Sequence, residues 1–112
     1  MTIAKEKVCL KALQQICEAN FPQDEYSLNG AKECAVCLEK TINGWTVYEK
    51  EKNSRNDTYL YDNVIDASMD LLKRLSTASK YSELKNIYYN AIISKTLEPI
   101  RRVKKQKKIA VM

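Results

Sequence analysis

The residues whose types and spacing most clearly suggest chemistry are the bases of the C-terminal stretch EPIRRVKKQKKIAVM. Residues 1–98 carry 13 Lys or Arg and 14 Asp or Glu, whereas residues 99–112 carry six bases and no acid. Each base that neutralises a phosphate releases counterions, so such a run is typical of a segment that contacts nucleic acid. The sequence therefore predicts a nucleic-acid-binding tail, consisting of Arg101, Arg102, Lys104, Lys105, Lys107 and Lys108.

The same tail has other interpretations. It could dock on an acidic protein, serve as a nuclear localisation patch, or fold back on the chain's own aspartates. It could also be a solvated extension without a function. No nucleic-acid-recognition motif is visible beside it, so the pattern does not distinguish DNA from RNA. The partner we expect is nucleic acid or a nucleic-acid-associated protein.

The rest of the chain lacks the residues of common catalytic sites. It contains no histidine, which removes Ser-His and Cys-His nucleophile pairs and His-containing zinc sites. Its two glycines are too few for a phosphate-cradling loop or a dinucleotide fingerprint. A carboxylate-based site is not excluded. We therefore expect a regulatory or accessory protein that is not an enzyme and holds no cofactor and no metal.

Four cysteines, Cys9, Cys17, Cys34 and Cys37, fall in the first third of the chain. The Cys34-x-x-Cys37 pair could be a redox motif or, with the other two thiols, a zinc site. A redox cysteine needs a helix N-terminus and zinc ligands come in tight pairs in turns, whereas this stretch has helical periodicity. We expect buried free thiols instead.

A second candidate surface lies in the body of the chain. Asp62, Asp66 and Asp70 repeat every four residues, which would align three carboxylates on one helix face. This stripe has three interpretations: a docking surface for a basic partner, a divalent-cation site, or a solvated face. Tyr59 and Tyr89 are expected to add exposed contact area to it, since tyrosine is enriched in interfaces. The rival function is thus a stoichiometric protein-binding inhibitor, such as a toxin-neutralising or phage-encoded antagonist.

We expect the elements that position these residues to be helices. Apolar periodicity predicts helices over about 2–19, 27–42, 57–75 and 82–97, and Asn43-Gly44 is interpreted as the C-terminal stop of the second. Residues 45–57 are ambiguous: a capping box at Thr46-x-x-Glu49 favours a short helix, while alternation in WTVY and TYLY favours a hairpin. The expected fold is all-α, a compact bundle of four to six short helices with an alternative β-hairpin near 45–61. Residues 1–98 would form the helical domain and 99–112 a basic extension.

Two further expectations concern location and assembly. Charged residues near the N-terminus interrupt any signal-peptide core, and the longest apolar run is too short to span a bilayer. These features predict a cytoplasmic protein, or a nuclear one if the host is a eukaryote, without a membrane partner. The apolar stripe over 27–42 steps like a heptad, which raises the third interpretation of a structural subunit and of a homo-oligomer.

Overall fold

The first helix follows the sequence pattern closely. In the computed structural model, which describes the backbone of residues 2–111 and the side chains of residues 2–94, α1 spans Ile3–Asn20. Thr2 caps it, because its hydroxyl accepts a hydrogen bond from the backbone N–H of Lys5 at 3.2 Å. The helix buries one apolar face, made of Cys9, Ala12, Leu13, Ile16 and Cys17. The prediction of a helix over 2–19 is confirmed.

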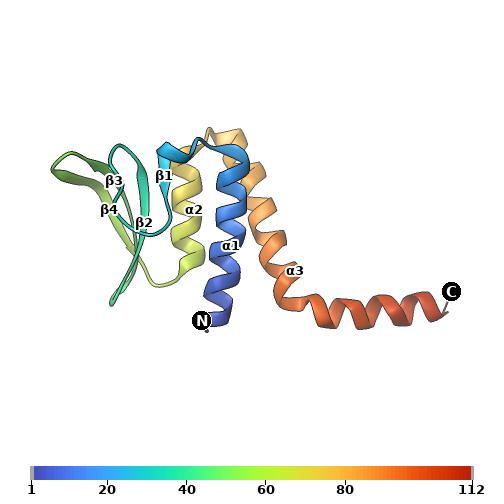
Figure 1. Cartoon of the computed structure of the whole chain (residues 1–112). Coiled ribbons are helices and arrows are strands. Elements are labelled where there is room, and N and C mark those ends of the chain that lie inside the picture. Colours follow the sequence, from blue (N-terminus) through green and yellow to red (C-terminus); the bar gives the residue numbers. More distant parts are fainter. Residues whose placement is uncertain (1, 112) are drawn as a thin grey trace.

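After a short 3₁₀ turn, η1 (Gln23–Glu25), the chain forms a four-stranded sheet. Its strands are β1 (Tyr26–Ser27), β2 (Val36–Thr41), β3 (Gly44–Glu51) and β4 (Ser54–Tyr61). They lie in the order β1-β2-β3-β4, with β1 parallel to β2 and the other neighbours antiparallel (Figure 1). The fold is therefore α+β, and the expectation of an all-α bundle of four to six helices was wrong.

The helix predicted over 27–42 is the main source of that error. The residues of its apolar stripe do not share a face: Leu38 is fully buried, whereas Ile42 is fully exposed in the turn between β2 and β3. Gly44, read as part of a helix stop, instead opens β3 with φ +139°, and a Cβ there would collide with the carbonyl oxygen of Tyr61. Only glycine fits this position, where two strands approach closely.

The ambiguous stretch 45–57 belongs to a hairpin, so the favoured short helix was wrong and the alternative was right. Glu51 pairs with Ser54 across a two-residue turn, and Trp45 pairs with Tyr61 at the other end. The pairing is irregular between Val47 and Glu49 of β3. The extra residue is on β4, where Asp57 and Thr58 together lie opposite Tyr48, and Asp57 has a left-handed φ of 50°.

Two helices follow the sheet. Helix α2 (Val64–Leu75) begins later than the predicted start near 57, because β4 continues to Tyr61. Asn63 caps it by accepting a hydrogen bond from the backbone N–H of Asp66 at 2.9 Å. Helix α3 (Ala78–Val111) begins earlier than the predicted residue 82.

The helices cover one face of the sheet. Helix α2 packs on β2 and β3, α1 packs beside α2, and α3 packs on both helices away from the sheet (Figure 1). The main core lies between these layers and includes fully buried Leu13, Leu38, Val47, Leu71 and Leu72. A second, small buried cluster is formed by Ala35, Cys37 and Tyr48. Within the described part of the chain, no helix has the length and apolarity needed to cross a membrane.

Candidate interaction surfaces

The six bases of the predicted tail lie outside the residues whose side chains the structure describes. The same holds for the proposed boundary between residues 1–98 and 99–112. These two predictions therefore stay predictions.

Four bases of the body are engaged in ion pairs. Lys40 contacts Glu6 at 2.7 Å and lies 5.3 Å from the centre of the Trp45 ring. This contact with Lys40 lowers the pKa of the Glu6 carboxyl. Three more cations of the body lie 2.9–3.6 Å from a carboxylate, in the pairs Lys50–Glu33, Arg55–Glu39 and Arg74–Asp70. These four positive charges are thus neutralised within the fold.

The three aspartates of the predicted stripe have different environments. Asp62 is exposed in the bend before α2, outside the helix. Asp66 belongs to the cap of α2, where its carboxylate accepts a hydrogen bond from the side chain of Asn63 at 3.0 Å. Asp70 accepts hydrogen bonds from the hydroxyl of Tyr61 and from Arg74. The continuous carboxylate stripe is not formed, and the described residues hold no group of acids or thiols arranged for a metal ion.

The two predicted contact tyrosines are both exposed but lie on different elements. Tyr59 is on β4 with 59% of its surface exposed, and Tyr89 is on α3 with 38% exposed. The sheet and α3 lie on opposite sides of the helical layer formed by α1 and α2 (Figure 1). Asp62, Asp66, Asp70 and both tyrosines therefore do not form one docking surface.

The cysteines are all free thiols. Cys9, Cys17 and Cys37 are buried as predicted, whereas Cys34 is exposed in a turn with a left-handed φ of 58°. Burial raises the pKa of each buried thiol, and raises that of Cys17 to about 12. The buried thiols are thereby kept protonated and unreactive.

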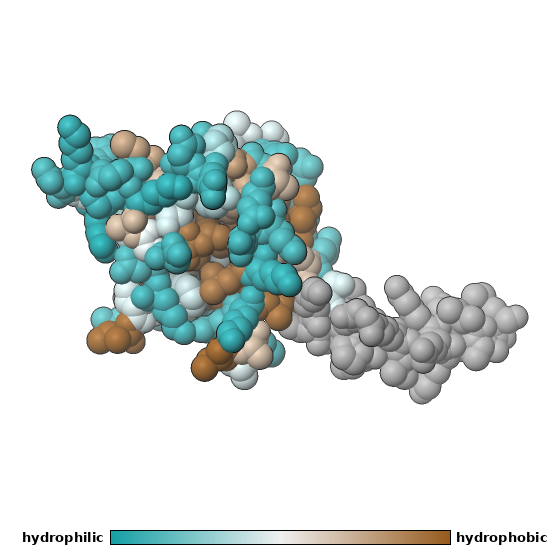
Figure 2. All heavy atoms as spheres, in the orientation of Figure 1, coloured by the Kyte–Doolittle hydropathy of each residue, from teal (hydrophilic) through white to brown (hydrophobic). Residues whose placement is uncertain are grey.

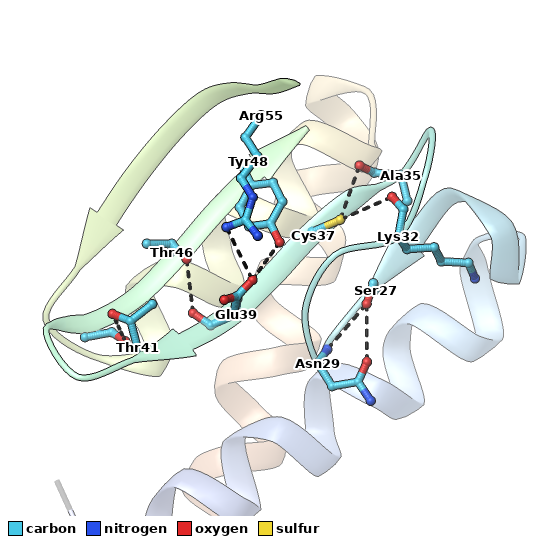
Figure 3. A network of polar contacts seen from close by, with 11 residues as sticks. Ser27, Asn29, Lys32, Ala35, Cys37, Glu39, Thr41, Thr46, Tyr48 and Arg55 are labelled. Carbon is cyan, nitrogen blue, oxygen red and sulfur yellow. Dashed lines mark hydrogen bonds and ion pairs between the residues drawn. The ribbon is translucent and has the colours of Figure 1, made fainter. Parts of the chain in front are cut away.

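The outer face of the sheet carries a polar network that the sequence did not reveal. Glu39 of β2 accepts a hydrogen bond from the hydroxyl of Tyr48 at 2.7 Å, and Arg55 lies 3.6 Å from the same carboxylate (Figure 3). The Arg55 guanidinium also lies 4.5 Å from the centre of the Tyr48 ring. Burial, and then the contact with Glu39, raise the pKa of Tyr48. These groups satisfy one another, so the network links three strands.

Most of the face seen in Figure 2 is hydrophilic, with apolar surface gathered where the helices meet the sheet. A groove of about 740 Å³ runs between α1 and the segment that contains η1 and β1. Leu10, Phe21 and Leu28 contribute apolar lining, while Lys32 on the rim donates a hydrogen bond to the carbonyl of Gln23 at 2.5 Å. Gln14, Glu18 and Asn29 contribute polar groups to the same lining.

The free edge of the sheet is a surface that sequence reasoning missed. Strand β4 is the last in the sheet order, and all of residues 54–60 are exposed. Two of them are large and apolar: Tyr59 and Leu60, the latter with 55% of its surface exposed. An exposed edge of this length presents unpaired backbone groups and is a template for pairing with another strand.

Comparisons with known protein families, with curated proteins and with solved structures find no match for this chain. Its function is therefore inferred from its own residues, contacts and charges.

Proposed function

We propose that the chain is a small non-enzymatic regulatory or accessory protein that binds nucleic acid, or a complex containing it, through the tail bases at 101–108. The observation that carries this proposal is the segregation of charge. The body has a net charge of −1 over residues 1–98, while the last 14 residues hold six bases and no acid. A polyanion is therefore attracted to the tail and not to the body.

Phosphate neutralisation is the mechanism. The six bases release counterions from the nucleic acid when they contact it, which gives affinity without base recognition. The body contributes little to this attraction because its acids outnumber its bases by one, and some of its cations are also paired, as Lys40 is with Glu6 and Arg74 with Asp70. Exposed tyrosines such as Tyr89 offer additional contact area, since an aromatic ring can stack on an unpaired base.

The absence of an enzymatic role is part of the same proposal. The sequence has no histidine, and the titratable groups of the described network around Glu39 are engaged with one another. The buried thiols are held protonated. These features support binding over catalysis.

The proposal is tested with two full-length variants that remove the same charge from different places. In the tail variant all six bases at 101–108 are replaced by Gln. In the matched control, Gln replaces six exposed lysines that make no ion pair with the described residues: Lys5, Lys7, Lys11, Lys52, Lys73 and Lys85. Binding of labelled duplex DNA, single-stranded DNA and RNA is measured. The tail variant should lose binding and the control should keep most of it; equal losses in both would refute a role for the tail.

A second candidate function is the stoichiometric protein-binding inhibitor. The observation that favours it is on α3, where Ile87 and Tyr89 are 46% and 38% exposed beside a buried face that includes Tyr88. Large apolar groups on the outside of a helix are typical anchors for a protein partner. A protein target that is captured equally by the tail variant, and lost on Ile87→Glu, would favour this function over nucleic-acid binding.

A further inference from the structure

Both glycines of the chain follow an asparagine, in the pairs Asn29-Gly30 and Asn43-Gly44. An asparagine can react with the backbone nitrogen of the next residue, which attacks the side-chain carbonyl carbon, Cγ. Glycine favours this attack because it has no side chain to obstruct the approach of its nitrogen. The sequence makes the two pairs equivalent, so any difference between them comes from the fold.

The reaction needs only the chain itself and water. A bond forms between the glycine nitrogen and Cγ of the asparagine, and the bond from Cγ to Nδ2 breaks. Ammonia leaves with the proton that the glycine nitrogen gives up, and a cyclic imide remains. Water then opens the imide: opening at Cγ gives aspartate, and opening at the main-chain carbonyl gives isoaspartate.

The fold restrains the first pair. Oδ1 of Asn29 accepts a hydrogen bond from the Ser27 hydroxyl at 3.3 Å, and the backbone N–H of Asn29 donates to the same hydroxyl at 3.5 Å (Figure 3). The side chain is thereby held on the side of residue 27. The attacking nitrogen is held as well, because Gly30 N–H donates to the carbonyl of fully buried Leu38 at 3.0 Å. Asn29 can react only when both groups leave their partners.

The second pair lies at the tip of the hairpin formed by β2 and β3. Asn43 is exposed in the turn, and its side-chain amide has no hydrogen-bond partner among the described residues. Only its backbone N–H is held, by Oγ1 of Thr41 at 3.2 Å. Gly44 and Thr41 form the last pair of the ladder, so the nitrogen of Gly44 becomes free when the end of the hairpin opens. Asn43 therefore reacts after a smaller opening than Asn29.

Packing fixes the glycine of this second pair but not the asparagine. A Cβ on Gly44 would collide with the carbonyl oxygen of Tyr61, so only glycine is accommodated there. Asn43 does not have a left-handed φ, so its backbone conformation does not require asparagine. Replacement of Asn43 is therefore compatible with the turn, which provides a control variant for the reaction.

We infer that Asn43 is a site of spontaneous deamidation in the folded protein, and that Asn29, although it precedes the other glycine, is protected by its contacts. The product carries one more negative charge than the original chain. In the isoaspartate form the backbone is also longer by one carbon atom, at the turn where Oγ1 of Thr41 donates to the Gly44 carbonyl at 3.2 Å. The modification therefore loosens the end of this hairpin. This inference does not rest on the proposed nucleic-acid binding.

The first test follows both pairs in one sample. The full chain is incubated at mildly alkaline pH, and the loss of the side-chain amide at each asparagine is measured by mass spectrometry of its peptides. Asn43 should lose its amide about tenfold faster than Asn29, the factor expected when one site must break one or two fewer hydrogen bonds than the other. Isoaspartate at residue 43 is quantified separately by methylation with an isoaspartyl-specific carboxyl methyltransferase.

Internal references separate the effects of sequence and fold. In a denaturant that unfolds the chain, Asn29 and Asn43 should react at similar rates, because both then precede an unrestrained glycine. Asn53, which is exposed in the other hairpin turn but precedes Ser54, should react more slowly than Asn43 in both states.

Two variants test the contacts themselves. In the native chain Ser27→Ala should accelerate the reaction of Asn29 and leave that of Asn43 unchanged, since it removes the hydroxyl that holds the Asn29 side chain. Asn43→Gln should eliminate the isoaspartate signal from the hairpin peptide, because the longer side chain disfavours the five-membered imide. Equal rates for Asn29 and Asn43 in the native chain, or a faster reaction at Asn29, would overturn the inference. So would a native chain that keeps the Asn43 amide while the unfolded chain loses it.

Discussion

Tyr61, the last residue of β4, donates a hydrogen bond from its hydroxyl to Oδ2 of Asp70 on α2 at 2.6 Å. This contact joins the edge strand to the helix that covers the sheet. Because the acceptor is charged and half-buried, Tyr61→Phe should lower the free energy of unfolding by about 1.5–3 kcal/mol. Urea unfolding of the two proteins measures this difference. An unchanged midpoint and slope would show that the bond contributes nothing to stability.

The same pair predicts a pH dependence. Burial, followed by the hydrogen bond to Asp70, raises the pKa of Tyr61 to about 12 from an ordinary value of 10.0. The folded state therefore holds the phenol proton more tightly than the unfolded state, so stability present below about pH 10 is lost as the pH rises toward about 12. Unfolding measured across this interval should show a smaller loss for Tyr61→Phe than for the unmodified chain. Parallel curves for the two proteins would contradict the assignment.

Arg74 links α2 to the hairpin through several contacts. It lies 3.0 Å from Asp70 and 3.5 Å from Glu49, and only 12% of its side chain is exposed. Arg74→Met leaves these acids without their partner, so we expect a loss of about 3–5 kcal/mol in the free energy of unfolding. Hydrogen exchange in β4 should also become faster. The neighbouring exposed Lys73→Met serves as the control and should change stability by less than about 0.5 kcal/mol.

The thiols differ in accessibility. Cys34 is exposed, whereas Cys9, Cys17 and Cys37 are buried and have raised pKa values. In the folded protein a thiol reagent should therefore modify one cysteine quickly and the other three only as fast as the protein unfolds. Cys34→Ser should abolish the fast phase. Two fast-reacting thiols in the native chain would show that at least one of Cys9, Cys17 and Cys37 is accessible.

Local signals explain which elements the sequence could predict. Helix α1 was predictable because its cap and its apolar face lie within one continuous segment. Strand β2 was not, because Cys37 and Leu38 are both fully buried although they point to opposite faces of the sheet. One packs in the main core and the other in the small cluster with Tyr48. A pair of adjacent apolar residues is compatible with a helix, and equally with a strand whose two faces are both covered.

One local signal for the sheet was present and was misread. Asn43-Gly44 was interpreted as a helix stop, but it is also a strong signal for a hairpin turn when strand-like segments flank it. In the structure Ile42 and Asn43 form the turn between β2 (VCLEKT) and β3 (GWTVYEKE), and Gly44 is the first residue of β3. Reading this dipeptide as a turn would have favoured the hairpin over the short helix at 45–57.

The surfaces depend on nonlocal pairing and were harder to predict. The prediction of an aspartate stripe assumed a helix from residue 57 onward. Because β4 extends to Tyr61, Asp62 lies before α2 and the stripe does not form. The free edge of the sheet, β4, could not be predicted from the sequence, because no local pattern shows which strand lies last in a sheet. The tail, in contrast, is a property of composition alone and needs no fold to be recognised.

The salt dependence of nucleic-acid affinity tests the central claim most directly. If the six tail bases each neutralise a phosphate, the logarithm of the association constant for duplex DNA should fall with the logarithm of salt concentration with a slope of about −5. The variant with Gln at all six tail positions should bind weakly, with a slope near zero, while the matched body variant keeps the steep slope. A shallow slope for the unmodified chain, or a steep slope retained by the tail variant, would contradict the proposal that the tail is the phosphate-binding segment.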